Sequence, residues 1–379
     1  MSEAELVGEV TRNERRAALF HASPFILATA LLLTTLVAIP VVAGTAQTTI
    51  ETVRIRAKAA GFEGTILIGE ADGTSTTIAS DAKLAPGSVW RWASITKQLA
   101  AVIAMQEVAA GRLDLDAPVS RYWPEWKAPY AGKIRIRDLM LHDSGLPQPD
   151  ESPADADGVP AFYRAAAASP ASSANGFCAG PARAAPPAKY EYNNCDAIVL
   201  GEVLARITGR PFDELVRKRL SGPLGMRSFG MFRFGRPPHA YVRPTGEFSD
   251  KDPLINFGVY GASAGAYGNI GDLWRFDHAL LTGKLLPAGE REQMWQSSRD
   301  NGFYGFLQWI FPSKLSGCGR DIRIVERQGL VGGIELRNYL LPQTGQAVIL
   351  FSRHRPSNFG DPWEGKGFAY DVLSAVVCR

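Results

Sequence analysis

Ser94 and Lys97 lie three residues apart at the start of an apolar run, SITKQLAAVIAMQEVAA (94–110). Apolar residues recur in this run at helical spacing, and the run stops at Gly111, a residue type that often ends helices. Residues three apart on a helix share a face, so the Lys97 amine can reach the Ser94 hydroxyl. Burial of the helix would lower the pKa of Lys97 and let the amine take the hydroxyl proton. The pair makes Ser94 a candidate nucleophile. The alternative is an ordinary surface helix, on which serine and lysine three residues apart are common.

A second group of chemical interest is Tyr192-Asn193-Asn194, which precedes AIVLGEVLARITG, a predicted helix that ends at Gly209. A phenol near an ammonium can ionise at a lower pH than free tyrosine, so Tyr192 is a candidate base or proton shuttle. The Asn194 amide could position both the lysine and a substrate carbonyl. The alternative is structural, with Tyr192 packed in the core and Asn194 capping the helix.

The third group, Arg327-Gln328-Gly329-Leu330, ends a predicted strand. A glycine on an edge strand allows a substrate backbone to approach, and the N–H of Leu330 could complete an oxyanion hole with the N–H of Ser94. The guanidinium of Arg327 could bind a substrate carboxylate. An ordinary exposed strand end would explain the same residues.

These residues must be positioned by a fold, and the patterns along the chain indicate its class. Two alternating runs around a Gly73 turn predict a hairpin, four helical patterns occupy the middle of the chain, and strand patterns return near its end before a closing helix. We predict an α/β (α+β) fold in which an antiparallel sheet flanked by helices (about 50–125 and 285–379) carries an all-helical lobe (about 126–284). The predicted strands are 61–70, 74–80, 304–311, 321–327, 333–341 and 346–352. The predicted helices are 94–110, 134–142, 195–208, 211–219, 271–282 and 366–378. Residues 151–189 are expected to form an irregular surface segment, with a possible short helix at 160–168.

Composition excludes some classes of partner. The 379 residues include 41 basic and 38 acidic side chains without a long run of one sign, so we expect no nucleic-acid partner. Residues 25–42 form an uncharged, largely apolar stretch behind three arginines, which predicts an export signal cleaved after about Ala46 or a retained anchor. Residues 1–46 would then be the only membrane contact, and 47–379 an exported domain, periplasmic or secreted, or held at the inner membrane.

Four cysteines allow three pairings, and export would make pairing favourable. We favour Cys178 with Cys195 and Cys318 with Cys378, and four buried thiols are the alternative. The cysteines form no C-x-x-C element and the chain has only five histidines, so we expect no zinc site.

Taken together, the three groups resemble in order and spacing the serine β-lactamase and penicillin-recognising enzyme family, in particular its class C-like branch with related esterases and D-aminopeptidases. The resemblance runs from about Gly61 to Leu350. It implies a two-lobed fold, a covalent acyl-Ser94 intermediate, Lys97 and Tyr192 sharing the proton transfers, and no metal or other cofactor. It also includes the stretches GRLDLDAPVSRYWPEW, IRIRDLMLHDSGLP, TGRPF, PLGM and GNIGDLWRF.

Two positions depart from the family pattern. Asn193 stands where the family usually has serine, between a retained tyrosine and asparagine. Arg327 and Gln328 stand where true β-lactamases have Lys-Thr. Arginine keeps the positive charge but is longer and planar, which argues against antibiotic hydrolysis.

Other hypotheses compete with this one. Gly261-Ala262-Ser263-Ala264-Gly265 matches a nucleophile elbow, but the glycines that follow delay the next helix to about Asn269. His142 and Asp143 invite a triad, yet adjacent residues cannot supply a base and its orienting acid, so His142 is expected to be structural.

We therefore expect a serine hydrolase that cleaves an ester or amide of a small molecule or peptide, with a β-lactam, a D-amino acid peptide or an ester as substrate. The alternative is a non-catalytic protein that binds penicillin or cell-wall peptides.

Overall fold

The computed structural model describes residues 41–378 except 157, 165–168, 234–239, 247–248, 250–254, 298–299, 301 and 355–358. Residues 1–40, which make up most of the predicted signal or anchor (1–46), lie outside the described residues. Among the residues that are described, no helix is both long enough and apolar enough to cross a bilayer. The compact unit considered below spans Ala43–Arg379.

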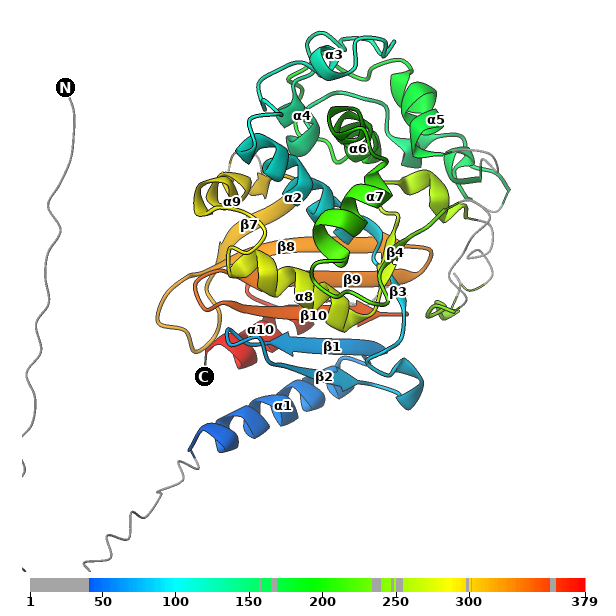
Figure 1. Cartoon of the computed structure of the whole chain (residues 1–379). Helices are drawn as coiled ribbons and strands as arrows, with labels where there is room; N and C mark the ends of the chain where they lie inside the picture. The colour runs from blue at the N-terminus through cyan, green and yellow to red at the C-terminus, as the bar shows by residue number, and fades with distance from the viewer. Residues whose placement is uncertain are drawn as a thin grey trace, which may run out of the picture. The chain divides into compact units, whose positions relative to one another are not determined.

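The centre of this unit is one antiparallel sheet that joins strands from both ends of the chain (Figure 1). The predicted hairpin forms β1 and β2, and β1 pairs with β10 so that Ile66 lies opposite Leu350. The predicted antiparallel sheet is thereby confirmed. Its order is β2-β1-β10-β9-β8-β7-β6, and the strands are β1 (Gly64–Gly69), β2 (Ser75–Ala79), β6 (Tyr304–Gly305), β7 (Gln308–Ser313), β8 (Ile322–Val331), β9 (Ile334–Leu341) and β10 (Gln346–Ser352).

Two predicted strands have different bounds in the structure. The run 304–311 is split into β6 and β7, because Leu307 adopts a positive φ of 59° and turns the chain. Strand β8 continues to Val331, beyond the predicted end at 327, because residues 327–331 keep pairing with β9. Strand β7 pairs with β8 only as far as Glu326 of β8, which lies opposite Trp309, so the last part of β8 has β9 on one side only.

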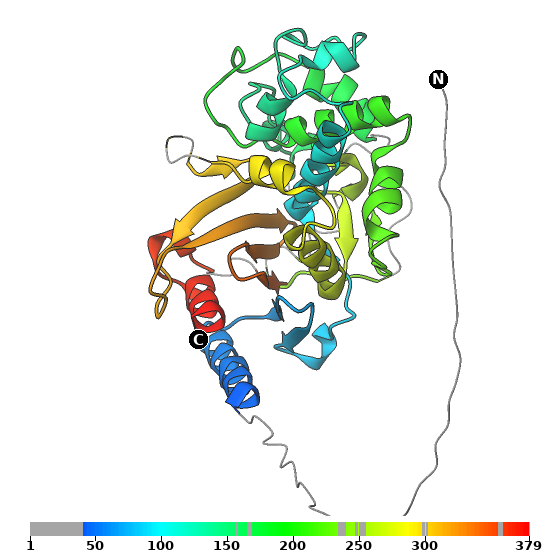
Figure 2. The same ribbon diagram turned by 60° about the vertical axis from the view of Figure 1, so that its left-hand side comes forward.

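Helices cover both faces of the sheet. On one face, α1 (Val41–Ala59) and α10 (Phe368–Val377) lie side by side, as Figure 2 shows, and their apolar residues share a core cluster with the sheet. On the other face, α8 (Ile270–Leu281) packs so closely on β1 that a Cβ added at Gly69 would lie 2.4 Å from the ring of Trp274.

The remaining helices form a group above the sheet in Figure 1. Its central helix is α2 (Thr96–Ala109), which is buried on almost every side because apolar residues of other helices surround it. The other members are α3 (Val119–Tyr122), α4 (Ile136–Leu141), α5 (Pro170–Asn175), α6 (Asn194–Thr208), α7 (Phe212–Val216) with a π-helical turn at Arg217–Ser221, and α9 (Ala288–Met294).

A small second sheet, β3-β5-β4, carries strands β3 (Trp90–Arg91), β4 (Gly230–Met231) and β5 (Ala266–Gly268). Strand β3 leads directly to Ser94, and β5 follows the glycine-rich segment that contains Ser263. This sheet therefore holds two site segments near each other although they are far apart in the sequence.

Both favoured cysteine pairings are confirmed. Cys178 is bonded to Cys195, which joins the 3-10 turn Phe177–Ala179 to the first turn of α6. Cys318 is bonded to Cys378, which joins the β7–β8 connection to the end of α10. The described residues contain no free cysteine.

Candidate active site

Ser94 lies in a 3-10 turn, Ala93–Ile95, directly before α2 rather than inside the helix as predicted. The preceding residue, Ala93, is fully buried with a positive φ of 47°, a strained conformation for a residue other than glycine. Thr96 fixes the turn: its hydroxyl donates to the Ala93 carbonyl and accepts from the Ala266 N–H of β5. The nucleophile candidate is thus held between two packed elements.

Lys97 is completely buried and its amine meets three oxygens. The Nζ atom lies 3.1 Å from Ser94 Oγ, 2.7 Å from Asn194 Oδ1 and 2.9 Å from the carbonyl oxygen of Ser263. Burial, reinforced by the charge of Arg327, lowers the pKa of Lys97 well below its ordinary value. The predicted depression of the Lys97 pKa is therefore confirmed, and the cause includes a second cation.

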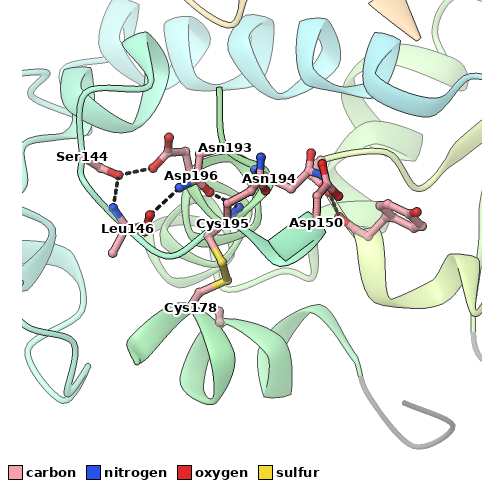
Figure 3. Close-up of a disulfide and its surroundings, with 12 residues drawn as sticks. Ser144, Leu146, Asp150, Cys178, Asn193, Asn194, Cys195 and Asp196 are labelled. Atoms are coloured by element: carbon pink, nitrogen blue, oxygen red, sulfur yellow. Dashed lines mark hydrogen bonds between the residues drawn. A yellow bond between two sulfur atoms is a disulfide. The ribbon is translucent and has the colours of Figure 1, made fainter. Parts of the chain in front are cut away.

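The Tyr192-Asn193-Asn194 segment is set by the start of α6. Asn193, not Asn194, caps the helix: its Oδ1 accepts from the N–H of Cys195, and its amide donates to the carbonyl of Leu146. Figure 3 shows this region, with the disulfide of Cys195 beside it. Asn193, which departs from the family pattern, thus has a structural role, and Asn194 remains free to contact Lys97.

The phenol of Tyr192 completes the group. Its oxygen lies 2.6 Å from Ser94 Oγ and accepts a hydrogen bond of 2.7 Å from Arg327. Burial raises the pKa of Tyr192, although Arg327 and the hydrogen bond with Ser94 act in the opposite direction. The predicted lowering of the Tyr192 pKa is therefore wrong, because desolvation of the phenolate outweighs the nearby cation.

Arg327 is buried, and its guanidinium donates to three protein oxygens. The Nε atom bonds to the Ser94 carbonyl at 2.9 Å, and the two terminal nitrogens bond to the phenols of Tyr304 and Tyr192. This geometry favours a role in holding Ser94 and Tyr192 over the predicted role in binding a substrate carboxylate.

The end of β8 lies beside the Ser94 turn. A Cβ added at Gly329 would be 2.7 Å from the Trp92 carbonyl, so only glycine allows this approach. The next residue, Leu330, is 45% exposed on the part of β8 that extends past β7. The predicted oxyanion residues Gly329 and Leu330 are therefore brought to the segment that carries Ser94.

Several contacts in the site were not predicted from the sequence. The Ser263 carbonyl and the Tyr304 phenol contact Lys97 and Arg327, and the segment 148–150 is bound to the Tyr192 motif. Gln148 donates to the Tyr192 carbonyl and accepts from the Asn194 N–H. The sequence indicated only the stretch that ends at Pro147, which is part of the family resemblance. A backbone carbonyl such as that of Ser263, or a single phenol in a strand such as that of Tyr304, has no characteristic sequence pattern.

The competing serine and histidine hypotheses find no support in this geometry. The Ser263 hydroxyl donates to the Tyr260 carbonyl, and no helix follows it until Ile270, since β5 intervenes. His142 is buried, with Nδ1 2.7 Å from Asp196 Oδ2, and its ring packs 4.9 Å from that of Tyr192. Burial lowers the pKa of His142 well below its ordinary value, so the imidazole is neutral and packs against the ring of Tyr192.

The chain is similar to several known proteins. The Bacillus subtilis (strain 168) protein PbpX, whose name assigns it provisionally to the penicillin-binding proteins, is 25% identical over 278 residues, which are 68% of this chain and 60% of PbpX. The esterase EstB of Burkholderia gladioli is 31% identical over 170 residues, 40% of this chain and 42% of the esterase. The chain thus spans less than two thirds of either relative.

Among solved structures, the D-amino acid amidase from Ochrobactrum anthropi SV3 in complex with D-phenylalanine has a TM-score of 0.71 at 18% identity, covering 87% of this chain and 98% of that chain. This likeness shows that the two proteins share a fold. The family model described as Beta-lactamase matches residues 55–356, from α1 past the end of the sheet. The match covers most of the chain, and the protein therefore belongs to the Beta-lactamase family.

Proposed function

We propose that the protein is a serine hydrolase that cleaves an ester or amide through an acyl-Ser94 intermediate. The observation that carries the proposal is the environment of the Lys97 amine. A neutral amine has two N–H groups and one lone pair, and the Asn194 and Ser263 oxygens can only accept. They occupy the two N–H groups, which leaves the lone pair directed at the Ser94 hydroxyl. The depressed pKa of Lys97 favours this neutral form.

In the first step, Ser94 Oγ attacks the substrate carbonyl while its proton passes to Lys97. Tyr192 stays a phenol, since burial raises its pKa, and it can donate its proton to the leaving group. The proton that Lys97 took from Ser94 then replaces the one that Tyr192 gave up. The C–O bond to Ser94 forms and the bond to the leaving group breaks, so that the leaving group departs protonated. Water then attacks the acyl-enzyme and Lys97 takes a proton from it. Lys97 passes this proton to Ser94 Oγ as the bond between the acyl carbon and Oγ breaks, so the acid is released and the Ser94 hydroxyl is regenerated.

The remaining site residues have supporting roles in this proposal. The N–H groups of Ser94 and Leu330 stabilise the oxyanion, and Gly329 allows β8 to come close enough. Asn194 positions Lys97 and the substrate carbonyl. Arg327 positions substrate indirectly, through its hydrogen bond to Tyr192.

We also propose that the protein works outside the cytoplasm. Its two disulfides fit an oxidising compartment, and residues 25–42 supply an export or anchor sequence. Periplasmic, secreted and membrane-anchored forms are each compatible with this reading.

The test is covalent labelling of Ser94 combined with turnover. We expect a phosphonate probe to add to Ser94, as measured by intact mass, and a short-chain nitrophenyl ester to be hydrolysed; a penicillin and a D-Ala-D-Ala peptide then map the acyl donor. Ser94→Ala should lose about 10³-fold or more in rate. Ser263→Ala is the matched control and should retain most activity, because its carbonyl still binds Lys97. Equal losses in the two variants would count against Ser94 as the nucleophile, and an unlabelled Ser94 without turnover of any substrate would favour a non-catalytic binding protein.

A further inference from the structure

His142 is a buried histidine beside the site that the proposed mechanism does not use. It ends α4 with a positive φ of 60°, in the left-handed region where glycine is the usual residue. Its ring centre lies 4.9 Å from that of Tyr192, and its carbonyl accepts from the N–H of Glu191 at 3.0 Å. An unfavourable backbone conformation is thus kept at a residue that contacts Tyr192 with its ring and the Tyr192 segment with its backbone.

The imidazole of His142 is held by one buried carboxyl group. Its Nδ1 atom lies 2.7 Å from Oδ2 of Asp196, and the other carboxyl oxygen, Oδ1, accepts from the Ser144 hydroxyl. Figure 3 shows Ser144 beside Asp196, which belongs to the first turn of α6. Nε2 of His142 has no hydrogen-bond partner among the described residues. The orientation of the ring therefore depends, for its hydrogen bonding, on Asp196.

His142 and Asp196 are both neutral in this contact. Burial raises the pKa of Asp196 well above its ordinary value. Burial, and then the charges of Lys97 and Arg327, lower the pKa of His142 well below its own. A protonated carboxyl can donate from Oδ2 to Nδ1 while its Oδ1 accepts from Ser144, so a neutral Asp196 accounts for both hydrogen bonds. An ionised Asp196 would instead raise the pKa of Lys97 and make it a poorer candidate base.

The Tyr192 ring needs support because its oxygen has two partners. This oxygen must stay within reach of Ser94 Oγ, at 2.6 Å, and of the Arg327 guanidinium, at 2.7 Å. Lys97 and Arg327 also lie against the ring, but both groups end long side chains with many rotamers. The imidazole has fewer rotatable bonds and a hydrogen bond of its own, so it is the more rigid support.

From these contacts we propose that Asp196 and His142 are positioning residues for the reaction: Asp196 fixes the imidazole, and the imidazole fixes the Tyr192 ring so that its phenol can protonate the leaving group. This inference rests on the proposed function, in which Tyr192 donates that proton. Because both residues act through Tyr192, the effect of their loss should be largest where the reaction needs the proton most.

The test compares two esters of the same acid, assayed with the full chain. The leaving group of 4-nitrophenyl butyrate departs readily as an anion, whereas that of phenyl butyrate is more basic and depends more on protonation. In His142→Ala we expect kcat/KM to fall about 100-fold for phenyl butyrate and about 10-fold or less for 4-nitrophenyl butyrate. The ratio of the two rates in one preparation does not depend on the folded fraction, so a merely structural role would leave this ratio unchanged.

Two substitutions of Asp196 test the other half of the pair. Asp196→Ala removes the group that holds the imidazole, so the ratio of the phenyl to the nitrophenyl rate should fall as in His142→Ala. Asp196→Asn keeps a donor for Nδ1 of His142 and an acceptor for Ser144, and should recover most of the lost ratio. A ratio no higher in Asp196→Asn than in Asp196→Ala would overturn the inference. Where His142→Ala yields no folded protein, these two variants decide by the same ratio.

His278→Ala is the matched control, because this histidine of α8 packs 5.1 Å from the ring of Trp274 and lies against the β1–β2 turn. Its ratio should equal that of the parent protein. Equal losses for the two esters in His142→Ala, with Ser94 of the parent labelled by the phosphonate, would overturn this inference and leave the proposed function standing. Failure of Ser94 to react with the phosphonate would overturn the proposed function and this inference with it.

Discussion

Two buried basic side chains, Lys97 and Arg327, face one aromatic ring in this site. The Lys97 amine lies 4.8 Å and the Arg327 guanidinium 5.0 Å from the centre of the Tyr192 ring, and Arg327 also lies 5.1 Å from that of Trp309. Aromatic faces stabilise desolvated cations, and Arg327 has three hydrogen bonds as well. Arg327 can therefore stay charged in the interior, and its charge is one reason that Lys97 becomes a base.

At this scale we predict that Arg327→Gln shifts the pH–rate profile. Arg327 lowers the pKa of Lys97, so its removal raises that pKa and less free amine is present at a given pH. The acid limb of log kcat/KM against pH should move to higher pH, with the largest loss of activity on the acidic side.

Arg323→Gln is the matched control on the same strand, because Arg323 forms an exposed ion pair with Glu292. In Arg323→Gln, the acid limb of log kcat/KM should lie at the same pH as in the parent protein. An acid limb that stays in place or moves to lower pH in Arg327→Gln would contradict the assignment of Lys97 as the base.

At the scale of elements, the site depends on the contact between β8 and the Ser94 turn. Strand β8 extends past β7, so its last residues keep one unpaired edge beside Trp92 and Ser94. The turn itself is held from the other side by β5, through Thr96. Because both neighbours are strands with fixed registers, a small change in this contact alters the position of the nucleophile.

Gly329→Ala tests this contact. The added Cβ would lie 2.7 Å from the Trp92 carbonyl, which is backbone and cannot rotate away. We expect β8 to shift, with a loss of about 10²-fold in kcat/KM from misplacement and about 1–3 kcal/mol in unfolding free energy.

Gly319→Ala is the control, since a Cβ added at Gly319 meets no atom within 4 Å. Kinetics and urea unfolding of both variants would check the expectation. Full activity in Gly329→Ala would show that the approach of β8 is not needed for catalysis.

At the scale of the whole molecule, α2, α8 and the sheet meet in a buried polar cluster. Asn338 of β9 donates to Gln98 of α2 at 3.0 Å and to Asp277 of α8 at 2.9 Å, and Gln98 donates to Gln308 of β7. Burial raises the pKa of Asp277 to about 8, although the hydrogen bond from Asn338 lowers it. The folded protein therefore holds a proton on Asp277 at neutral pH.

We predict that Asp277→Asn reduces the pH dependence of stability. An unfolded Asp has a pKa near 3.8, so between about pH 4 and pH 8 unfolding releases the proton of Asp277. Because the folded state binds more protons, this group's contribution to the unfolding free energy falls as pH rises, by up to about 1.4 kcal/mol per pH unit.

Asparagine keeps the acceptor for Asn338 and has no proton to lose. Relative to the parent protein, the variant should gain stability as pH rises from 5 to 8, measured by urea unfolding. A stability difference that does not change with pH would show that Asp277 is ionised in the folded state.

Local sequence patterns were sufficient for much of this description. The sequence predicted the bounds of five elements within a few residues: the β1–β2 hairpin, α2, α6, α8 and α10. The spacing of apolar residues and the residue types that end an element are local properties of the chain, so they can be recognised without the fold. The proximity of Ser94 and Lys97 followed from a three-residue spacing, which one helical turn converts into contact whatever the rest of the fold does. The disulfide pairing was favoured in advance, but four cysteines permit three pairings and only the fold selects one.

Only the tertiary structure decided how the site works. Tyr192 is 98 residues from Ser94 and Arg327 is 135 residues from Tyr192, so their contacts depend on how α6 and β8 pack around α2. The direction of the Tyr192 pKa shift and the occupied guanidinium of Arg327 likewise depend on burial and on neighbours from other elements. Sequence determines which groups can react and which lie within a turn of each other, whereas the balance between desolvation and nearby charge is a property of the packed three-dimensional environment.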